Sequence, residues 1–361
     1  MISNRVNEID LLRFVAALSV VLFHYTFRGY AADGMSSMPY PLLAPIAKYG
    51  YLGVNLFFII SGFVILMTAA NGSLRGFVVS RLIRLYPAFW ACCTISFAAI
   101  GLMGDTRYSA SIDQYLINMT MLSGFLGIPA IDGVYWSLFV ELRFYALVAL
   151  ILAIGRIHQT QSLMTAWLIG SIILEIVPIG KFKYLLVTEY SAYFIAGSMF
   201  FLVWSKGVSP TKVGIITASC ALAIYQSLKT LSGFSEHYNT NMSSYTVSGI
   251  IGSFFVVMFF VSIRRTGFFA SRSYKIVGAL TYPLYLLHQT VGFMIFNFAY
   301  PALSEHLILW GVVVTMLGAS YGVNVLIEKR LSSSMKSWLN RSFDCMYRIG
   351  MRFNERVRIR R

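Results

Sequence analysis

Apolar runs of about 20 residues recur along the whole chain, and they limit its fold more than any other feature. A helix of that length crosses the hydrocarbon core of a bilayer, whereas the core of a soluble domain uses shorter runs. The composition agrees, because 57% of the residues are hydrophobic and 12% are charged, against about 25% charged in soluble domains. The sequence therefore predicts an all-α integral membrane protein and excludes a soluble enzyme or a disordered chain.

We predict a bundle of about ten transmembrane helices with both chain termini in the cytoplasm. One further apolar stretch, residues 112–128, is interrupted by glycine and proline. We expect it to be a re-entrant or interfacial piece, with an eleventh span as the alternative. The ten expected spans are residues 9–28, 49–70, 83–103, 135–155, 163–180, 184–204, 212–229, 246–263, 276–298 and 305–327.

The positive charge of the chain supports this orientation. The net charge is +15, which in a soluble protein would suggest nucleic-acid binding. In a membrane protein, Lys and Arg instead collect in the cytoplasmic loops. Of the 27 basic residues outside the expected spans, 21 fall on the inner side and six on the outer side. The bias remains without the tail, so we expect no nucleic-acid partner.

The chain is expected to consist of a transmembrane domain, residues 1–328, and a basic cytoplasmic tail, residues 329–361. An amphipathic helix on anionic lipid headgroups is the preferred interpretation of the tail, and a plain solvated segment is the alternative. The four cysteines show no metal-binding spacing, and no metal site is expected. Apolar residues recur in the tail at helical spacing, namely Met335, Trp338, Leu339, Phe343, Met346 and Tyr347.

The first expected span carries two residues that a bilayer disfavours, Arg13 and His24. An α-helix turns by about 100° per residue, so eleven residues leave the two side chains within about 20° of one face and about 16 Å apart along the axis. One face thus carries a fixed cation near its cytoplasmic end and a titratable imidazole further out. A snorkelling Arg and a buried, hydrogen-bonded His are the alternative.

Separate spans bring further polar residues to a depth similar to that of His24. A carboxylate beside an imidazole can orient it and raise its basicity, as in general-base catalysis. A polar network that holds helices together is the alternative, and Arg143 would favour it by neutralising Glu141. The residues at this depth are Asn55, Glu141, Tyr285 and His288, with Tyr282 on the same helical stripe as the last two.

A third feature is the pair Arg81 and Arg84, three residues apart at the expected cytoplasmic start of the third span. The two side chains face the same way. A helix N-terminus there would add partial positive charge, so phosphate is the natural ligand. Arg75 lies close by in the sequence. Ordinary positive-inside flanking is the alternative interpretation.

Five motifs occur in order along the chain. They are EIDLLR at residues 8–13 followed by Phe23 and His24, GVNLFFIISGF at 53–63, RLIRLYP at 81–87, WSLFVELRFY at 136–145 and TYPLYLLH at 281–288. Together they resemble the acyltransferase-3 family of integral membrane acyltransferases. At two positions the chain departs from that family, because Leu142 replaces a usual second acid and Arg143 replaces a frequent Gln. Glu141 is therefore the sole acid at this point of the motif.

The resemblance implies transfer of an acyl group, most often acetyl, from cytoplasmic acyl-CoA to a hydroxyl of an extracytoplasmic or lipid-linked glycan such as O-antigen or exopolysaccharide. Acyl-CoA would be a co-substrate, with no bound cofactor. The resemblance also implies a bacterial inner membrane and a short family form, without the extracytoplasmic hydrolase-like domain of longer relatives. A glycan exporter of the same fold is the alternative.

Roles for the candidate residues follow from this resemblance. His24 is expected to be a general base or to form a transient acyl-imidazole, with Glu141 orienting it or stabilising the imidazolium. Arg81 and Arg84 would hold the phosphates of CoA, and Arg13 would line the inner half of the channel. Asn55, Tyr285 and His288 are expected to polarise the thioester carbonyl, and Tyr282 is expected to belong to the same supporting polar core.

Overall fold

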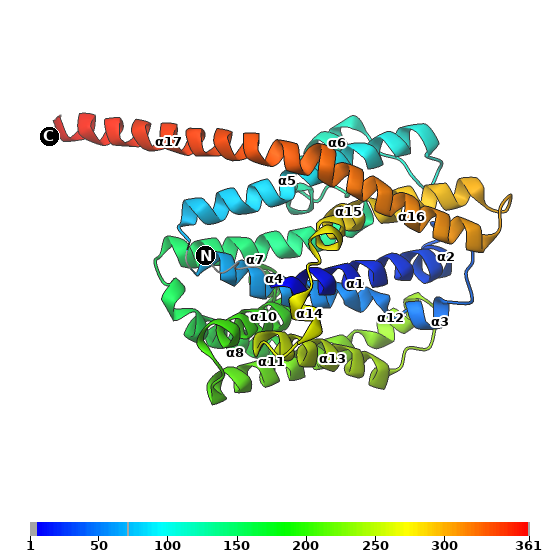
Figure 1. The fold of residues 1–361 in the computed structure, drawn as a ribbon, viewed down its shortest axis with the longest axis horizontal. Coiled ribbons are helices and arrows are strands. Elements are labelled where there is room, and N and C mark those ends of the chain that lie inside the picture. The colour runs from blue at the N-terminus through cyan, green and yellow to red at the C-terminus, as the bar shows by residue number, and fades with distance from the viewer. Residues whose placement is uncertain (1–5, 71, 360–361) are drawn as a thin grey trace.

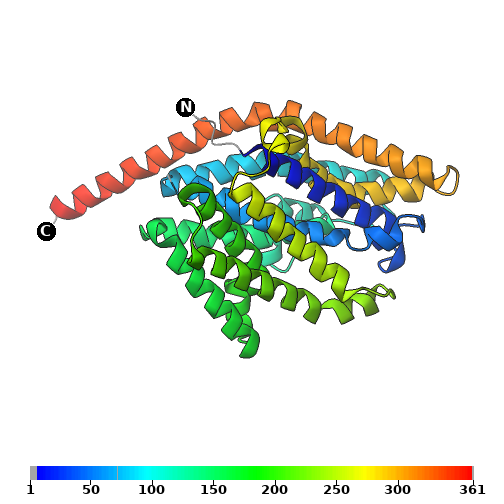
Figure 2. The same cartoon turned by 60° about the horizontal axis from the view of Figure 1, so that its bottom comes forward.

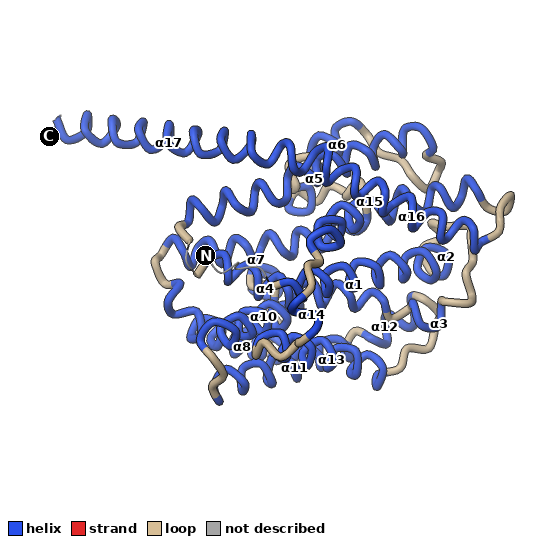
Figure 3. The backbone as a smooth tube through the Cα atoms, in the orientation of Figure 1, coloured by secondary structure: helices blue, strands red, loops and turns tan. Residues whose placement is uncertain are grey.

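The computed structural model describes residues 6–70 and 72–359, and regular structure in that part of the chain is helical, without strands (Figures 1 and 3). The long helices are α1 Asn7–Phe23, α4 Gly53–Ala69, α5 Leu74–Met103, α7 Trp136–Ala153, α8 Thr160–Ile176, α10 Thr188–Lys206, α11 Pro210–Lys229, α13 Ser244–Ser262, α15 Lys275–Ala299, α16 Glu305–Val323 and α17 Lys329–Ile359. The short helices are α2 Gly29–Ala31, α3 Ala44–Ala47, α6 Ile112–Asn118, α9 Gly180–Leu185, α12 Leu231–His237 and α14 Phe268–Ser271.

Among the described residues, seven helical segments are long and apolar enough to cross a membrane. These segments confirm the prediction of an all-helical, multi-pass membrane protein. Each of the ten predicted spans contains a helix, but α8, α11 and α15 are not among the seven. The segment 112–128 is not an eleventh span, because it forms only the seven-residue helix α6 and a 3-10 turn at Ser123–Phe125.

Helix α5 begins nine residues before the predicted start, and this corrects one part of the sequence interpretation. The Ser73 side chain accepts a hydrogen bond from the Gly76 N–H and so caps the helix at Leu74. Arg81 and Arg84 therefore lie within α5 rather than at its first turn. The partial positive charge of the helix N-terminus is confined to the first turn, so it does not contribute to binding at these two arginines.

Helices α1 and α4 lie between two groups of helices (Figures 1 and 2). Helices α8, α10, α11 and α13 form one group, in which α10 packs on α4; on the other side, α15 contacts α1, α5 and α16. The α4–α10 contact is unusually close because glycines face it. A Cβ on Gly197 would lie 1.9 Å from the Ile59 carbonyl oxygen, and a Cβ on Gly62 would lie 2.3 Å from that of Phe194. Small residues permit such close approach of membrane helices.

Two π-helical turns interrupt the long helices. Helix α1 continues through the π-turn η1, His24–Arg28, and α16 continues into α17 through η6, Asn324–Glu328. Such turns occur often at functional sites because the wider turn changes the direction of the side chains that follow. Here each π-turn ends on a charged residue beside a cavity, Arg28 in η1 and Glu328 in η6.

The C-terminal tail is the long helix α17, which extends past the bundle in Figures 1 and 2. Within its described side chains, Leu339 is buried and Trp338 is exposed. Arg75 of α5 binds the helix, with an ion pair to Asp344 at 2.5 Å and a hydrogen bond to the Asn340 carbonyl at 2.8 Å. The predicted apolar stripe also includes Met346 and Tyr347, whose side chains lie outside the described part of the structure.

Candidate active site

Three adjoining cavities run through the bundle from the start of α1 to its π-turn. The basic cavity, of about 790 Å³, is lined by Asp10, Arg13, Arg84, Lys275, Glu328 and Lys329 among others. The middle cavity, of about 170 Å³, shares Arg13, Val64 and Arg84 with it. The histidine cavity, of about 590 Å³, includes His24 and shares Val54 and Tyr285 with the middle cavity. Each cavity therefore borders the next through common side chains.

The structure brings Arg13, Arg81 and Arg84 together on the middle cavity. Arg84 pairs with Glu328 and lies 5.6 Å from the centroid of the Tyr282 ring. Arg81 donates to the Ser80 hydroxyl at 2.9 Å, while its buried Nε has no partner among the described residues. Arg13 makes no hydrogen bond or ion pair in the described part of the chain. A guanidinium has five N–H donors, so each of the three groups retains donors without a partner among the described residues.

Glu141 lies in the middle cavity and not beside His24. The Ser61 hydroxyl donates a hydrogen bond to its Oε1 atom, and the Tyr145 hydroxyl donates to the same atom at 2.6 Å. The ion pair with Arg143, which would have favoured the alternative of a polar network, is not among the described contacts; that guanidinium donates to the Tyr184 carbonyl at 2.8 Å. Glu141 therefore balances the arginine cluster, and the predicted contact of its carboxylate with the imidazole does not form.

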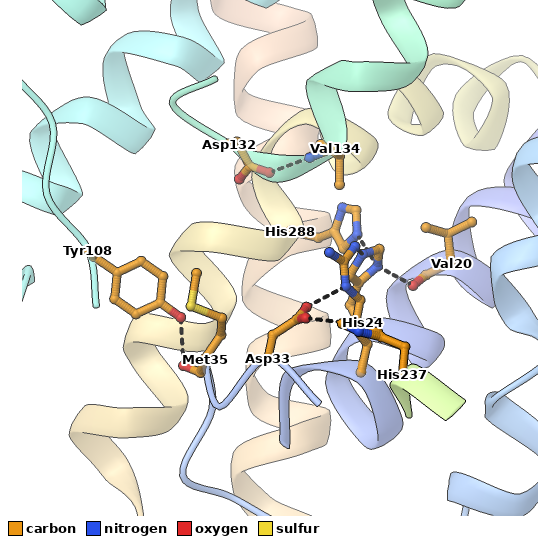
Figure 4. A network of polar contacts seen from close by, with 10 residues as sticks. Val20, His24, Asp33, Met35, Tyr108, Asp132, Val134, His237 and His288 are labelled. Atoms are coloured by element: carbon orange, nitrogen blue, oxygen red, sulfur yellow. Dashed lines mark hydrogen bonds and ion pairs between the residues drawn. The ribbon is translucent and has the colours of Figure 1, made fainter. Parts of the chain in front are cut away.

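His24 instead contacts His288. The Nε2 atom of His288 lies 3.1 Å from Nδ1 of His24, and this Nδ1 lies 2.8 Å from the Val20 carbonyl oxygen (Figure 4). The Nδ1 of His288 lies 2.9 Å from the Tyr285 carbonyl oxygen. Carbonyl oxygens only accept, so both Nδ1 atoms carry hydrogen. The single Nδ1–H of His24 is then shared between the Val20 carbonyl and Nε2 of His288, and Nε2 of His24 keeps an unprotonated lone pair.

The other predicted polar residues divide between the cavities. Asn55 lines the histidine cavity and donates to the Tyr193 hydroxyl at 3.0 Å. Tyr285 lines both the middle and histidine cavities, with its hydroxyl 2.8 Å from that of Ser137. Tyr282 lines the middle cavity and donates to the Leu85 carbonyl at 3.3 Å. His288 is fully buried behind His24, so it supports the imidazole without lining a cavity described here.

The sequence analysis missed a charged group beside His24. Arg28 lies four residues further along the π-turn, with its NH1 atom 3.3 Å from Nε2 of His24. Its Nε donates to Asp33 at 2.6 Å, and the other oxygen of Asp33 lies 3.4 Å from His237 Nε2. The spacing of four between His24 and Arg28 was the available signal, since such residues share a helical face.

A buried carboxylate, Asp132, also went unnoticed in the sequence. It is fully buried and accepts hydrogen bonds from the backbone N–H groups of Val134 at 3.1 Å and Thr290 at 2.9 Å. It therefore ties the segment before α7 to α15, two residues past His288. Burial raises the pKa of this carboxyl group to about 6, although the two N–H bonds oppose the shift.

Comparisons with known proteins match the chain to one family profile and to several curated relatives. A family profile described as an acyltransferase domain matches residues 6–327. Nodulation protein 10 of Rhizobium leguminosarum bv. viciae is 29% identical over 42% of this chain and 45% of its own length. An O-acetyl transferase of Shigella phage Sf6 is 26% identical over 41% of this chain and 46% of its own.

A third relative, the regulator of hypoxia-inducible factor 1 of Caenorhabditis elegans, is 26% identical over 48% of this chain and 39% of its own length. The chain thus spans less than half the length of each of these three relatives. No solved structure gives a significant match.

Proposed function

The chain belongs to the acyltransferase-3 family, and from this premise we propose that it is a membrane O-acyltransferase that moves an acyl group, most often acetyl, from cytoplasmic acyl-CoA to a glycan hydroxyl on the far side of the membrane. In this proposal the ten predicted spans all cross a bacterial inner membrane and both termini lie in the cytoplasm. The basic cavity then faces the cytoplasm and the histidine cavity faces outward.

The main support for this proposal is the row of three adjoining cavities. Acyl-CoA has an anionic nucleotide, a long thin pantetheine arm and a thioester at its end. The free donors of Arg13, Arg81 and Arg84 suit the phosphates, since Arg binds phosphate with a rigid planar fork. The middle cavity is the smallest of the three, at about 170 Å³, which suits the thin arm. Along α1, His24 lies about 16 Å beyond Arg13, where the thioester would arrive.

The histidine cavity suits a sugar acceptor. Its lining combines flat aromatic rings, including Trp136, Tyr190 and Phe234, with polar side chains such as Gln226 and Ser227. A sugar ring presents apolar C–H faces and hydroxyl edges, and a site of this kind orients such a ligand through a few well-placed polar groups. A hydroxyl that reaches Nε2 of His24 meets the one imidazole nitrogen whose lone pair is available.

His24 then removes the proton from that hydroxyl, and His288 holds the imidazole in the required tautomer. Because the structure pairs Glu141 with Ser61 and Tyr145, we assign its carboxylate to the charge balance of the donor channel. In the same proposal α17 lies on the anionic inner leaflet, anchored by Arg75. The acyl-imidazole route uses the same His24 nitrogen as its nucleophile.

Comparison of glycans from two strains tests the proposal. Surface and lipid-linked glycans are extracted from the source strain with and without the gene, and their ester-linked acyl groups are identified by mass spectrometry. We expect one class of glycan to lose O-acetyl groups in the deletion strain and regain them with the wild-type gene but not with His24→Ala. Identical acylation in both strains would contradict the proposal.

A further inference from the structure

Arg28 occupies a position next to the reacting nitrogen that no other cation of the histidine cavity shares. Its NH1 atom lies 3.3 Å from Nε2 of His24, its side chain is 27% exposed, and both residues line the histidine cavity. The cavity also contains Lys183 and Lys229, but both pair with Glu175, at 3.2 and 3.0 Å. Among the described residues that line this cavity, Arg28 is therefore the cation that lies within contact distance of His24.

The hydrogen bonds of Arg28 leave it with spare capacity. A guanidinium carries five N–H donors in a rigid plane. One N–H is directed to Asp33 and one toward His24, so three have no partner among the described residues. The contact with His24 is long for a hydrogen bond, and an incoming hydroxyl can replace it at low cost. Without substrate, Arg28 thus contacts Nε2 of His24, and with substrate bound it can direct a free N–H to that substrate.

The anchor of Arg28 is also well defined. Asp33 holds Nε of the guanidinium at 2.6 Å, and its second carboxylate oxygen faces Nε2 of His237 at 3.4 Å (Figure 4). His237 ends helix α12, so Asp33 connects the segment after η1 to a different part of the chain. This ion pair fixes one edge of a guanidinium that also lines the histidine cavity, and oriented donors in active sites are held in this way.

We propose that Arg28 is a catalytic residue that stabilises the oxyanion formed from the thioester carbonyl, with Asp33 as its positioning residue; this inference rests on the proposed acyltransferase function. The acceptor O–H bond breaks, its proton moves to Nε2 of His24, and the acceptor oxygen bonds to the carbonyl carbon. The electron pair of the C=O bond moves onto oxygen, where Arg28 donates hydrogen bonds. The C–O double bond then re-forms, the C–S bond breaks, and the CoA thiolate takes the proton from His24.

A kinetic comparison on purified full-length protein in liposomes tests the proposal. The probe is radiolabelled acetyl-CoA with water as acceptor, and release of CoA is followed. We expect Arg28→Gln to lower kcat by about 10²- to 10³-fold, the usual effect of losing one oxyanion donor, with KM for acetyl-CoA unchanged. Asp33→Asn leaves the guanidinium in place but unanchored and should cause a smaller fall in kcat. Arg107→Gln removes a matched exposed pair with Asp105 and should leave both constants unchanged.

The possible outcomes separate the role of Arg28 from the proposed acyltransferase function. Turnover by Arg28→Gln equal to that of the wild type, or a raised KM with unchanged kcat, overturns the oxyanion role and leaves the acyltransferase proposal intact. If the wild type itself releases no CoA, the proposed function fails and the role of Arg28 falls with it. Where Arg28→Gln does not fold, Arg28→Lys replaces it; the point charge of Lys lacks the planar fork, so a kcat equal to that of the wild type would again overturn the proposal.

Discussion

Nε2 of His288 lies 3.1 Å from Nδ1 of His24, and the two rings meet edge to face with centroids 4.9 Å apart. The Tyr285 carbonyl orients His288 in turn, so the pair forms a chain of hydrogen bonds that leaves Nε2 of His24 unprotonated. An imidazole therefore supports the candidate base here, where the sequence analysis expected the carboxylate of Glu141.

Replacement of His288 tests this supporting role. We expect His288→Ala to lower kcat by about 10- to 100-fold, since a hydrogen bond to a group that becomes charged contributes roughly 1.5–3 kcal/mol, and to leave KM for acetyl-CoA unchanged. The measurement is CoA release by the purified variant, with exposed His158→Ala as control. A kcat equal to that of the wild type would show that His24 orients itself without His288.

Arg84 offers a test of the donor channel. We expect Arg84→Gln to raise KM for acetyl-CoA by about 10- to 100-fold with little change in kcat, because one charge-assisted contact to a phosphate is lost. Arg75→Gln is the matched control, since Arg75 lies on the same helix but binds α17. An unchanged KM in Arg84→Gln would mean that its guanidinium serves only the ion pair with Glu328.

The glycine contact between α4 and α10 predicts a stability effect. A methyl group at Gly197 would overlap the Ile59 carbonyl at 1.9 Å, so we expect Gly197→Ala to destabilise the fold by about 1–3 kcal/mol, the range for overpacking. Gly214→Ala on α11 meets nothing within 4 Å and should be neutral or stabilising, by about 1 kcal/mol at most. Thermal unfolding in detergent measures both. Equal melting temperatures for the two variants would contradict the close packing.

Asp132 predicts a pH effect on stability. Burial raises its pKa from 3.8 to about 6, so the folded state holds the proton more tightly than the unfolded chain does. Asp132 therefore contributes about 3 kcal/mol to the free energy of unfolding below pH 3.8, and this contribution is lost as the pH rises through about 6. Asp132→Asn should lack this component. We expect the melting temperature of the wild type to fall relative to that of Asp132→Asn between pH 4.5 and 7.5. Parallel plots of melting temperature against pH for the two proteins would rule out this contribution of Asp132.

The helices were predictable because a bilayer requires long apolar segments with satisfied backbone groups. The early start of α5 was missed because Arg75, Arg81 and Arg84 reduce the apolar character of its first turns. Ser73 is a typical N-cap residue and could have indicated this start from the sequence. Position along a span predicts depth but not direction around the bundle axis, so Glu141 and His24 were placed at one level while they face different cavities. The spacing of four between His24 and Arg28 indicated a shared face, but residue periodicity does not indicate the π-turn on which both residues lie.

The measurement that most directly tests the account uses purified protein in liposomes, with radiolabelled acetyl-CoA supplied on the side of the basic cavity. CoA release and donor binding are followed for the wild type and for His24→Ala. We predict release that falls by at least about 10²-fold in His24→Ala, the lower bound for loss of a general base, with donor binding and folding retained. Equal release by both proteins, or a folded wild type that neither binds nor cleaves acetyl-CoA, would contradict the account, and the second result would favour a glycan exporter.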